Sequence, residues 1–329
     1  MRYGCTEMAT PRIAETTRPL VAVVIPCFNE APTVGKVVQD FHAAIPEADI
    51  VVIDNNSTDR TVEVARTAGA RVLFEHRQGK GFAVQSMFRR IHADILVMVD
   101  GDDTYPAEVV RALVDPVLRG EADMVVGSRL QQGAASQFRL VNRLGNRLLL
   151  GVLNTVFRVR LTDLLSGYRA FSRRLGRALP LAGGGFEIEA ELTIKTLQRG
   201  FAIKEVPVNL THRPPGSHSK IRILRDGFLI LSTILALFRD YKPLTFFGAI
   251  GLFLVVVGLL PGGVVIVEFA RTGLVPRLPS AILAVGLVLS GVVSGAVGLV
   301  LHATARRFQE VEVLLDRLAQ DEPEHTERD

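Results

Sequence analysis

The chain has few of the residues that build disulfide frameworks or cysteine-ligated metal clusters. Of its 329 residues only two are cysteines, Cys5 and Cys27, and tryptophan is absent altogether. This count excludes a disulfide scaffold and a cluster of cysteine metal ligands. Residues 1–18 contain no apolar stretch of the length that a secretory signal needs, so we expect the domain that follows them to stay in the cytosol.

Dense basic tracts and glycine-rich phosphate-binding motifs are also missing. The net charge is only +4, and no nucleic-acid partner is expected. Neither the Gly-x-Gly-x-x-Gly turn of dinucleotide-binding folds nor the P-loop motif occurs. Any phosphates that this chain binds must therefore be neutralised by a metal ion and by cations such as Arg77 and Lys80.

Long apolar runs, by contrast, are present near the C-terminus. The composition is 48% hydrophobic, and the runs Leu244–Val267 and Leu278–Leu301 contain no charged residue. Each is longer than the roughly 20 residues with which a helix spans a bilayer. Glycine and serine are scattered through both runs, as in closely packed membrane helices. We predict a transmembrane hairpin, and a pair of helices buried in a large soluble core is the alternative.

The domain organisation follows from these runs. Basic residues flank the outer ends of the hairpin and give a slight positive-inside bias, so we expect a two-span membrane protein with its catalytic domain in the cytoplasm. The predicted segments are a disordered stretch over 1–18, a cytosolic domain over 19–220, an amphipathic juxtamembrane helix over 221–243, a hairpin over 244–304 with spans 244–268 and 278–302, and a cytosolic tail over 305–329.

The first 129 residues alternate between short apolar runs and amphipathic segments. Runs rich in β-branched residues predict buried strands at 20–26, 50–54, 72–75, 95–99 and 122–126. Apolar residues at helical spacing predict helices at 32–44, 60–68, 79–91 and 106–119. Such alternation is typical of an α/β fold with a doubly wound, mostly parallel sheet. Arginines interleave with apolar residues over Phe138–Arg158, which predicts an amphipathic helix lying on a membrane surface or packed on the sheet.

Polar and acidic residues follow three of the predicted strands, where the carboxyl edge of a parallel sheet binds ligands. Asp100 and Asp102 lie on the same side of an extended backbone, and two hard oxygen ligands suit a divalent cation that also holds a diphosphate. An acidic turn bent at Gly101 is the alternative. A nucleotide would fit this edge, with Asp54 accepting from a base N–H and Glu30 from ribose hydroxyls.

These motifs together resemble a known family, the inverting family 2 glycosyltransferases with the GT-A fold. The resemblance rests on Pro-x-Phe-Asn-Glu, Asp-Asn-Asn-Ser-Thr-Asp, Gly-Lys-Gly and Asp-Gly-Asp in this order, and further on Val126–Arg129, Asp163–Arg169, Phe186–Glu189, Glu205–Pro207 and Arg213–Lys220. With the hairpin, the chain is similar to polyprenyl-phosphate glycosyltransferases, the group of dolichyl-phosphate mannose and glucose synthases and bacterial undecaprenyl-phosphate glucosyltransferases.

The resemblance covers roughly residues 19–245 and departs from the family at one position. Asn55 stands where many relatives carry a second aspartate, which leaves the contacts to the nucleobase open. Processive polysaccharide synthases carry a Gln-x-x-Arg-Trp motif, which a chain without tryptophan cannot have.

The resemblance implies inverting transfer of one sugar from a nucleotide sugar to a polyprenyl phosphate at the cytoplasmic membrane face, with Mg²⁺ or Mn²⁺ as cofactor. UDP-glucose is the leading donor, and GDP-mannose is the alternative. A phosphate monoester has a second pKa of about 6, so the acceptor is ionised without a strong general base. Transfer to a lipid hydroxyl would need such a base. A catalytically silent membrane scaffold remains as an alternative of another class, and a homo-oligomer is left open.

The predicted site residues fall into three groups. The catalytic group is Asp102, Asp163 and Glu189. The donor-binding group is Pro26, Asn29, Glu30, Asp54, Asn56, Lys80 and Asp100, with Asp100 and Asp102 as metal ligands. The acceptor-phosphate group is Arg129, Arg143, Arg213, Ser219 and Lys220. Two alternatives stay open: Asp163 as an N-cap before Leu164, and the segment around Glu189 as strand or helix, with Glu187 and Glu191 expected to be solvated.

Overall fold

The computed structural model describes residues 19–129, 150–211 without 152, 156, 158 and 186, and 232–321 without 233, 234 and 237. The chain divides into two compact units. Unit 1 comprises Met1–Arg139, Leu165–Gly185 and Gly200–Ser219, and unit 2 comprises Leu140–Leu164, Phe186–Arg199 and Lys220–Asp329. Most of both predicted basic amphipathic segments lies outside the described residues, as do Arg143, Arg213, Ser219 and Lys220.

Among its described residues, unit 1 contains a seven-stranded sheet of order β3-β2-β1-β4-β6-β5-β7. The strands are β1 Val21–Cys27, β2 Asp49–Asp54, β3 Arg71–Phe74, β4 Ile95–Met98, β5 Met124–Ser128, β6 Arg169–Ser172 and β7 Ile203–Pro207. The helices of this unit are α1 Val34–Ala44, α2 Thr61–Thr67, α3 Lys80–Arg90, η1 Ala107–Val109, α4 Val110–Leu118 and α6 Arg173–Ala178. Neighbouring strands are parallel except at β6, which pairs antiparallel with both β4 and β5.

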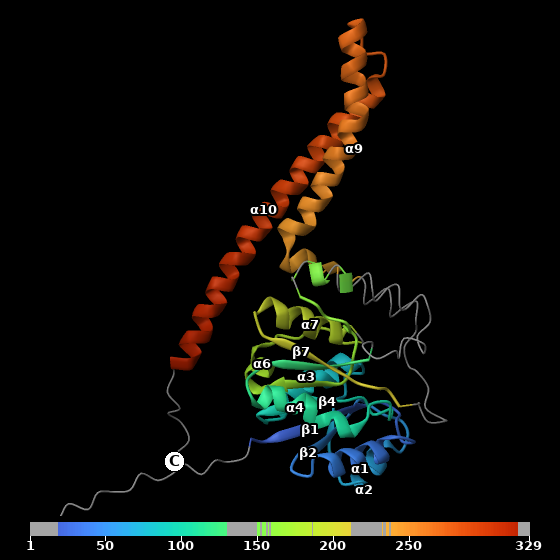
Figure 1. Cartoon of the computed structure of the whole chain (residues 1–329), viewed down its shortest axis with the longest axis vertical. Helices are drawn as coiled ribbons and strands as arrows, with labels where there is room; N and C mark the ends of the chain where they lie inside the picture. Colours follow the sequence, from blue (N-terminus) through green and yellow to red (C-terminus); the bar gives the residue numbers. More distant parts are fainter. Residues whose placement is uncertain are drawn as a thin grey trace, which may run out of the picture. The chain divides into compact units, whose positions relative to one another are not determined.

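Helices cover both faces of this sheet, as expected for a doubly wound fold (Figure 1). One face of β1 packs with Phe41 of α1 and Leu113 of α4 in the main hydrophobic core. On the other face lies α3, whose Phe88 meets Phe171 of β6 edge-on at 5.1 Å between ring centroids. Because successive strand residues point to opposite faces, strands buried on both sides read as continuous apolar runs.

All five predicted strands and all four predicted helices of this region are present, with ends shifted by a few residues. The last of these helices begins as the 3₁₀ turn η1. Strands β6 and β7 were not predicted. β6 is only four residues long and begins with a charged residue, and β7 at the sheet edge contains the adjacent charged residues Lys204 and Glu205, so neither forms an apolar run.

Two long helices of unit 2 confirm the predicted apolar segments: α9 Pro243–Thr272 and α10 Leu278–Asp321 run side by side (Figure 1). Both are long and apolar enough to cross a membrane. Their close approach depends on glycine. A Cβ on Gly251 would lie 2.6 Å from the carbonyl oxygen of Gly291, and one on Gly258 would lie 2.9 Å from Cβ of Leu287. Gly248 and Gly286 face open space instead, so only some of the small residues serve this packing.

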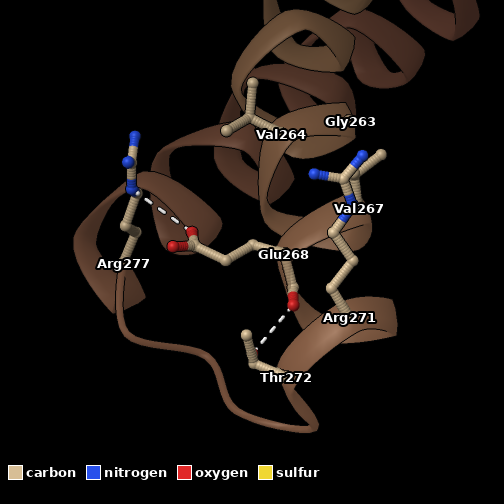
Figure 2. A pocket seen from close by; sticks show the side chains of 7 residues that line it. All are labelled: Gly263, Val264, Val267, Glu268, Arg271, Thr272 and Arg277. Atoms are coloured by element: carbon tan, nitrogen blue, oxygen red, sulfur yellow. Dashed lines mark hydrogen bonds and ion pairs between the residues drawn. The ribbon is translucent and has the colours of Figure 1, made fainter.

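At the turn end of the hairpin lies a hollow of about 460 Å³ (Figure 2). Its residues are Gly263, Val264, Val267, Glu268, Arg271, Thr272 and Arg277. The carboxylate of Glu268 faces Arg277, with 3.3 Å between Oε2 and Nε, while the Thr272 hydroxyl donates to the Glu268 carbonyl at 2.8 Å. None of the predicted site residues lines this hollow, and its one carboxylate is already paired with an arginine, so we place the candidate site in unit 1.

Candidate functional site

The three predicted polar strand ends lie at one edge of the sheet. Strand β1 pairs in parallel with both β2 and β4, so the loops that follow these strands are neighbours. Each loop contains one residue in the left-handed region: Asn29 at φ 51°, Asn56 at φ 64° and Asp103 at φ 58°. Asparagine and aspartate adopt this conformation more readily than other residues with a side chain. Backbone of this kind gathers at functional sites.

Hydrogen bonds fix these loops to one another. Thr58 N donates to Asn29 Oδ1 at 2.7 Å, and the hydroxyl of buried Thr33 donates to the Gly101 carbonyl at 2.7 Å. Glu30 N donates to Thr61 Oγ1 at 2.8 Å. The structure therefore gives Asn29 a part in holding the loops together, while Pro26 lies inside β1 and Asn56 is exposed at the edge.

Asp54, the last residue of β2, presents an unusual carboxylate. The residue is only 3% exposed, and its Oδ2 accepts from Ser57 N at 3.3 Å. Its Oδ1 is buried and has no hydrogen-bond partner. A buried acceptor without a hydrogen-bond partner costs about 1–3 kcal/mol. A ligand N–H that donates to Asp54 Oδ1 would remove this cost, so the geometry is compatible with a ligand-binding role for this oxygen.

Beside it, the Asn55 side chain holds the loop between β3 and α3. Its Nδ2 donates to the carbonyl oxygens of Glu75 at 3.2 Å and Arg77 at 2.7 Å, and its Oδ1 accepts from Gly79 N at 2.6 Å. Asn55 is 4% exposed. The departure noted in the sequence is thus explained by local structure, since only an amide side chain can both donate to the two carbonyls and accept from Gly79.

Lys80 and Asp100 form an ion pair at the same edge, with 2.5 Å between Nζ and Oδ1. Their side chains are 13% and 28% exposed, so this pair is partly shielded from solvent. Gly167 lies directly against Asp100, because a Cβ on Gly167 would overlap the Asp100 carboxylate. In the sequence, Gly167 was noted only as part of the segment Asp163–Arg169. Its contact with Asp100 could not be predicted, because the two residues lie far apart in the chain.

Asp102 lies two residues further along, in the turn after β4. Its Oδ1 accepts from the Thr104 hydroxyl at 2.6 Å and from Thr104 N at 3.3 Å. Asp102 is 9% exposed. The turn described as an alternative is therefore real, and it holds the carboxylate in place rather than excluding a site.

The donor set at Asp100 and Asp102 fits a hard divalent cation. Both offer carboxylate oxygens, and the Lys80 ammonium already beside Asp100 shows that positive charge is favourable there. No cluster of three or more histidine, cysteine or acidic side chains that could hold a metal is found in the part of the chain that the structure describes. An ion held by two carboxylates would take its remaining ligands from a diphosphate and water.

Two acidic side chains of these loops have shifted pKa values. The Arg77 guanidinium, 3.0 Å from Glu75 Oε1, holds the pKa of that carboxyl below its ordinary value against the opposing effect of burial. Burial opposes the shift at Asp59 too, but hydrogen bonds from Thr61 and Ala31 lower its pKa. Arg77 also lies over the Phe82 ring at 4.6 Å, so this proposed phosphate cation is engaged in local structure.

The remaining predicted residues are placed as follows. Arg129 directly follows β5 and is partly buried. Asp163 and Glu189 belong to unit 2 and are 1% and 4% exposed. Asp163 does not cap a helix, because residues 164–168 are not helical. The segment around Glu189 is helix α7, Ile188–Gln198, which decides between the two alternatives.

The expectation that Glu187 and Glu191 are solvated is wrong, since they are 7% and 4% exposed. Glu191 forms an ion pair with Lys195 one turn later in α7, at 2.6 Å. A buried carboxylate needs such a partner, and the four-residue spacing supplies it.

Comparison with known proteins identifies the family to which the chain belongs. Residues 22–177 match the glycosyl transferase family 2 domain. The crystal structure of glucosyl-3-phosphoglycerate synthase from Mycobacterium tuberculosis in complex with Mn²⁺ and UDP-glucose superposes with a TM-score of 0.55 and 28% identity, covering 67% of this chain and 79% of that one. The chain belongs to glycosyl transferase family 2, and it is a nucleotide-sugar glycosyltransferase with a GT-A-like mixed α/β sheet.

Within the family, its relatives include transferases that act on polyprenyl phosphates. Dolichyl-phosphate hexose transferase of Haloferax volcanii is 34% identical over 202 residues, which cover 61% of this chain and 87% of that protein. Polyprenol monophosphomannose synthase of Mycolicibacterium smegmatis is 32% identical over 234 residues, covering 65% of this chain and 86% of that protein.

Proposed function

We propose that this glycosyltransferase moves one sugar from a nucleotide sugar, with UDP-glucose as the first candidate, to a polyprenyl phosphate with inversion at the anomeric carbon. The observation that carries the proposal is the partnerless buried oxygen of Asp54 at the edge that also holds the Lys80–Asp100 pair. An acceptor for a base N–H and a charged group for a diphosphate are the two contacts that a nucleotide sugar needs.

The donor side is assigned to unit 1. Asp54 receives the base, Glu30 the ribose, and Lys80 the diphosphate, with Pro26, Asn29 and Asn56 shaping the loops. A divalent ion, Mg²⁺ or Mn²⁺, held by Asp100 and Asp102 would neutralise the leaving diphosphate as charge develops on it. Support comes from a structural relative that binds Mn²⁺ and UDP-glucose. GDP-mannose is the second candidate donor, because a relative is named as a monophosphomannose synthase.

The acceptor phosphate is assigned to four cations that follow the Asp100–Asp102 motif in the sequence, and to Ser219, which precedes the last of them. The cations are Arg129, Arg143, Arg213 and Lys220. Arginine matches phosphate oxygens with paired donors, and lysine adds a point charge. Since the lipid phosphate is already ionised, the chain has to position it in line with the anomeric carbon rather than deprotonate it. Asp163 and Glu189 are proposed to orient the sugar.

We further propose that the catalytic domain, over residues 19–220, faces the cytoplasm and is held at the membrane by the α9–α10 hairpin. The support is the length and apolar character of the two helices and the basic residues at their outer ends. In this arrangement a membrane-embedded polyprenyl chain presents its phosphate where a cytosolic nucleotide sugar is available.

The test is a matrix of donors and acceptors. The purified full-length protein in lipid nanodiscs is incubated with UDP-glucose, UDP-galactose, UDP-N-acetylglucosamine or GDP-mannose, and with undecaprenyl phosphate or diacylglycerol. We expect one nucleotide sugar to give a glycosylated lipid phosphate of inverted anomeric configuration. Transfer to diacylglycerol alone would overturn the acceptor assignment. A folded protein that binds no nucleotide and transfers no sugar would favour the silent scaffold.

A further inference from the structure

Asn55 forms three hydrogen bonds to one loop from a position where it is hidden from solvent. Its partners are the carbonyls of Glu75 and Arg77 and the N–H of Gly79, at 3.2, 2.7 and 2.6 Å. All three belong to the segment that joins β3 to α3. A single amide from the end of β2 therefore sets the path of the chain as it enters α3.

The residue after Gly79 is Lys80, the first residue of α3. Gly79 has φ 142° and ψ 137°, a conformation that is open to glycine. The carbonyl of Gly184 would overlap a Cβ on Gly79, so no other residue fits there. The Gly79 N–H therefore has a fixed orientation, and its hydrogen bond to Asn55 determines the point from which the Lys80 side chain starts.

The opposite side of the same turn is held by backbone of the 183–184 segment. Gly81 N donates to the Gly184 carbonyl at 3.1 Å, and Gln85 Nε2 donates to the Gly183 carbonyl at 3.0 Å. A Cβ on Gly81 would overlap the Gly183 carbonyl. Lys80 thus leaves a turn that is fixed on both sides, and its ammonium reaches Asp100 at 2.5 Å.

We propose that Asn55 is a positioning residue for the donor diphosphate and that it acts through Lys80. The inference rests on the proposed function in one respect, the assignment of Lys80 to the donor diphosphate. An aspartate at position 55 could still accept from Gly79 but would turn a carboxylate oxygen toward the carbonyls of Glu75 and Arg77. These two carbonyls need a donor, and an ionised carboxylate has none.

A double-mutant cycle tests the proposal. Asn55→Asp, Lys80→Ala and the double variant are prepared as full-length protein in nanodiscs, and UDP and GDP, each with Mg²⁺, are titrated calorimetrically. The cycle uses whichever nucleotide the wild type binds. We expect roughly 10-fold weaker binding for each single variant and no further loss when Asn55→Asp is added to Lys80→Ala, because two residues that act through one contact are not additive.

Asn154→Asp is the matched control. The Asn154 side chain, in a helical segment, likewise donates to the Leu161 carbonyl at 2.9 Å and accepts from Leu161 N at 3.0 Å. We expect its variant to bind nucleotide like the wild type. If Asn55→Asp does not fold, Asn55→Ser replaces it in the cycle.

The outcomes separate the inference from the function on which it rests. Unchanged nucleotide affinity in Lys80→Ala would remove Lys80 from the donor site and overturn both. A clear loss in Lys80→Ala combined with an additive loss from Asn55→Asp would leave the donor site intact and overturn only the role of Asn55. If Asn55→Asp binds nucleotide with wild-type affinity, the role of Asn55 is likewise overturned and the donor site is unaffected.

Discussion

Replacing Gly167 by alanine adds one methyl group directly against the Asp100 carboxylate. The new Cβ would lie 2.7 Å from both Cγ and Oδ1 of Asp100, closer than such atoms approach in proteins. Because the Asp100 side chain is 28% exposed, it can turn toward solvent instead of pushing the sheet apart. The expected cost in stability is therefore that of a displaced rotamer, about 0.5–1.5 kcal/mol, together with the loss of the ion pair with Lys80.

The expected cost in activity is larger. A turned carboxylate loses the charge-assisted bond to Lys80 and its proposed place as a metal ligand, and one charged hydrogen bond contributes about 1.5–3 kcal/mol. This corresponds to a decrease in kcat/KM of roughly 10- to 100-fold. The metal concentration that gives half-maximal activity should rise by a similar factor, since the remaining ligand is Asp102.

The assay is steady-state sugar transfer at varied Mg²⁺ or Mn²⁺, paired with thermal unfolding of the same samples. Gly286→Ala is the control, because a Cβ on Gly286 meets no atom within 4 Å. We expect a decrease in Tm of about 2–4 °C per kcal/mol for Gly167→Ala and no decrease in the control. Wild-type metal dependence in a folded Gly167→Ala variant would refute the reasoning that Asp100 serves the metal.

Four further predictions follow from the same site and fold. Asp102→Asn should lower turnover by about 100-fold or more while keeping the Thr104 hydrogen bonds, and excess EDTA should lower the turnover of the wild type by a similar factor. Full activity in either case would contradict the metal assignment. Arg213→Ala and Lys220→Ala should weaken the response to polyprenyl phosphate roughly 10- to 100-fold and leave donor affinity unchanged, measured by separate titrations, and the reverse pattern would mean that these residues serve the donor diphosphate. The pKa of Glu75 is lowered in the folded state, so its stabilising contribution is present above the unfolded pKa of about 4.3 and is lost as the pH falls through the folded pKa. Glu75→Gln should therefore reduce the loss of folding free energy at acidic pH, as measured by denaturant titration. An unchanged pH dependence of stability would contradict the role of the ion pair with Arg77. Gly291→Val should destabilise the hairpin by about 1–3 kcal/mol because its Cβ would lie 2.6 Å from the Gly251 carbonyl oxygen, and a protease sensitivity equal to that of the wild type would argue against this packing.

The central strands were predictable because each is an apolar run buried on both faces. Apolar character is the main sequence signal of the strands Val21–Cys27, Asp49–Asp54 and Ile95–Met98. Because these strands are parallel neighbours, the polar residues at their carboxyl ends lie at the same edge of the sheet. β6 was missed because an antiparallel strand of four residues, beginning with the fully buried Arg169, has no such pattern. Short strands of this kind are specified by their neighbours rather than by their own sequence.

The candidate site was predictable as a set of residues but not as a set of contacts. Asp54, Asp100 and Asp102 follow from residue type and position at strand ends. The role of Asn55 does not, because its partners lie 20 to 24 residues further along the chain and are backbone groups. Gly79 and Gly81 belong to the predicted helix over 79–91 and to the Gly-Lys-Gly motif. Their contact with the 183–184 backbone joins segments about 100 residues apart, so the local sequence could not predict it.

The length of α10 has a mechanical consequence. Its 44 residues span about 66 Å, roughly twice the thickness of the hydrocarbon layer. From Leu299 to Asp321 the sequence contains neither glycine nor proline, so the helix leaves the apolar region without a built-in hinge. The part of α10 beyond Gly298 therefore has no place at which it bends readily when the bilayer thickness changes. It tilts or slides instead, and the displacement appears at the emerging end. For the proposed membrane hairpin, a change in bilayer thickness would therefore move the C-terminal part of α10.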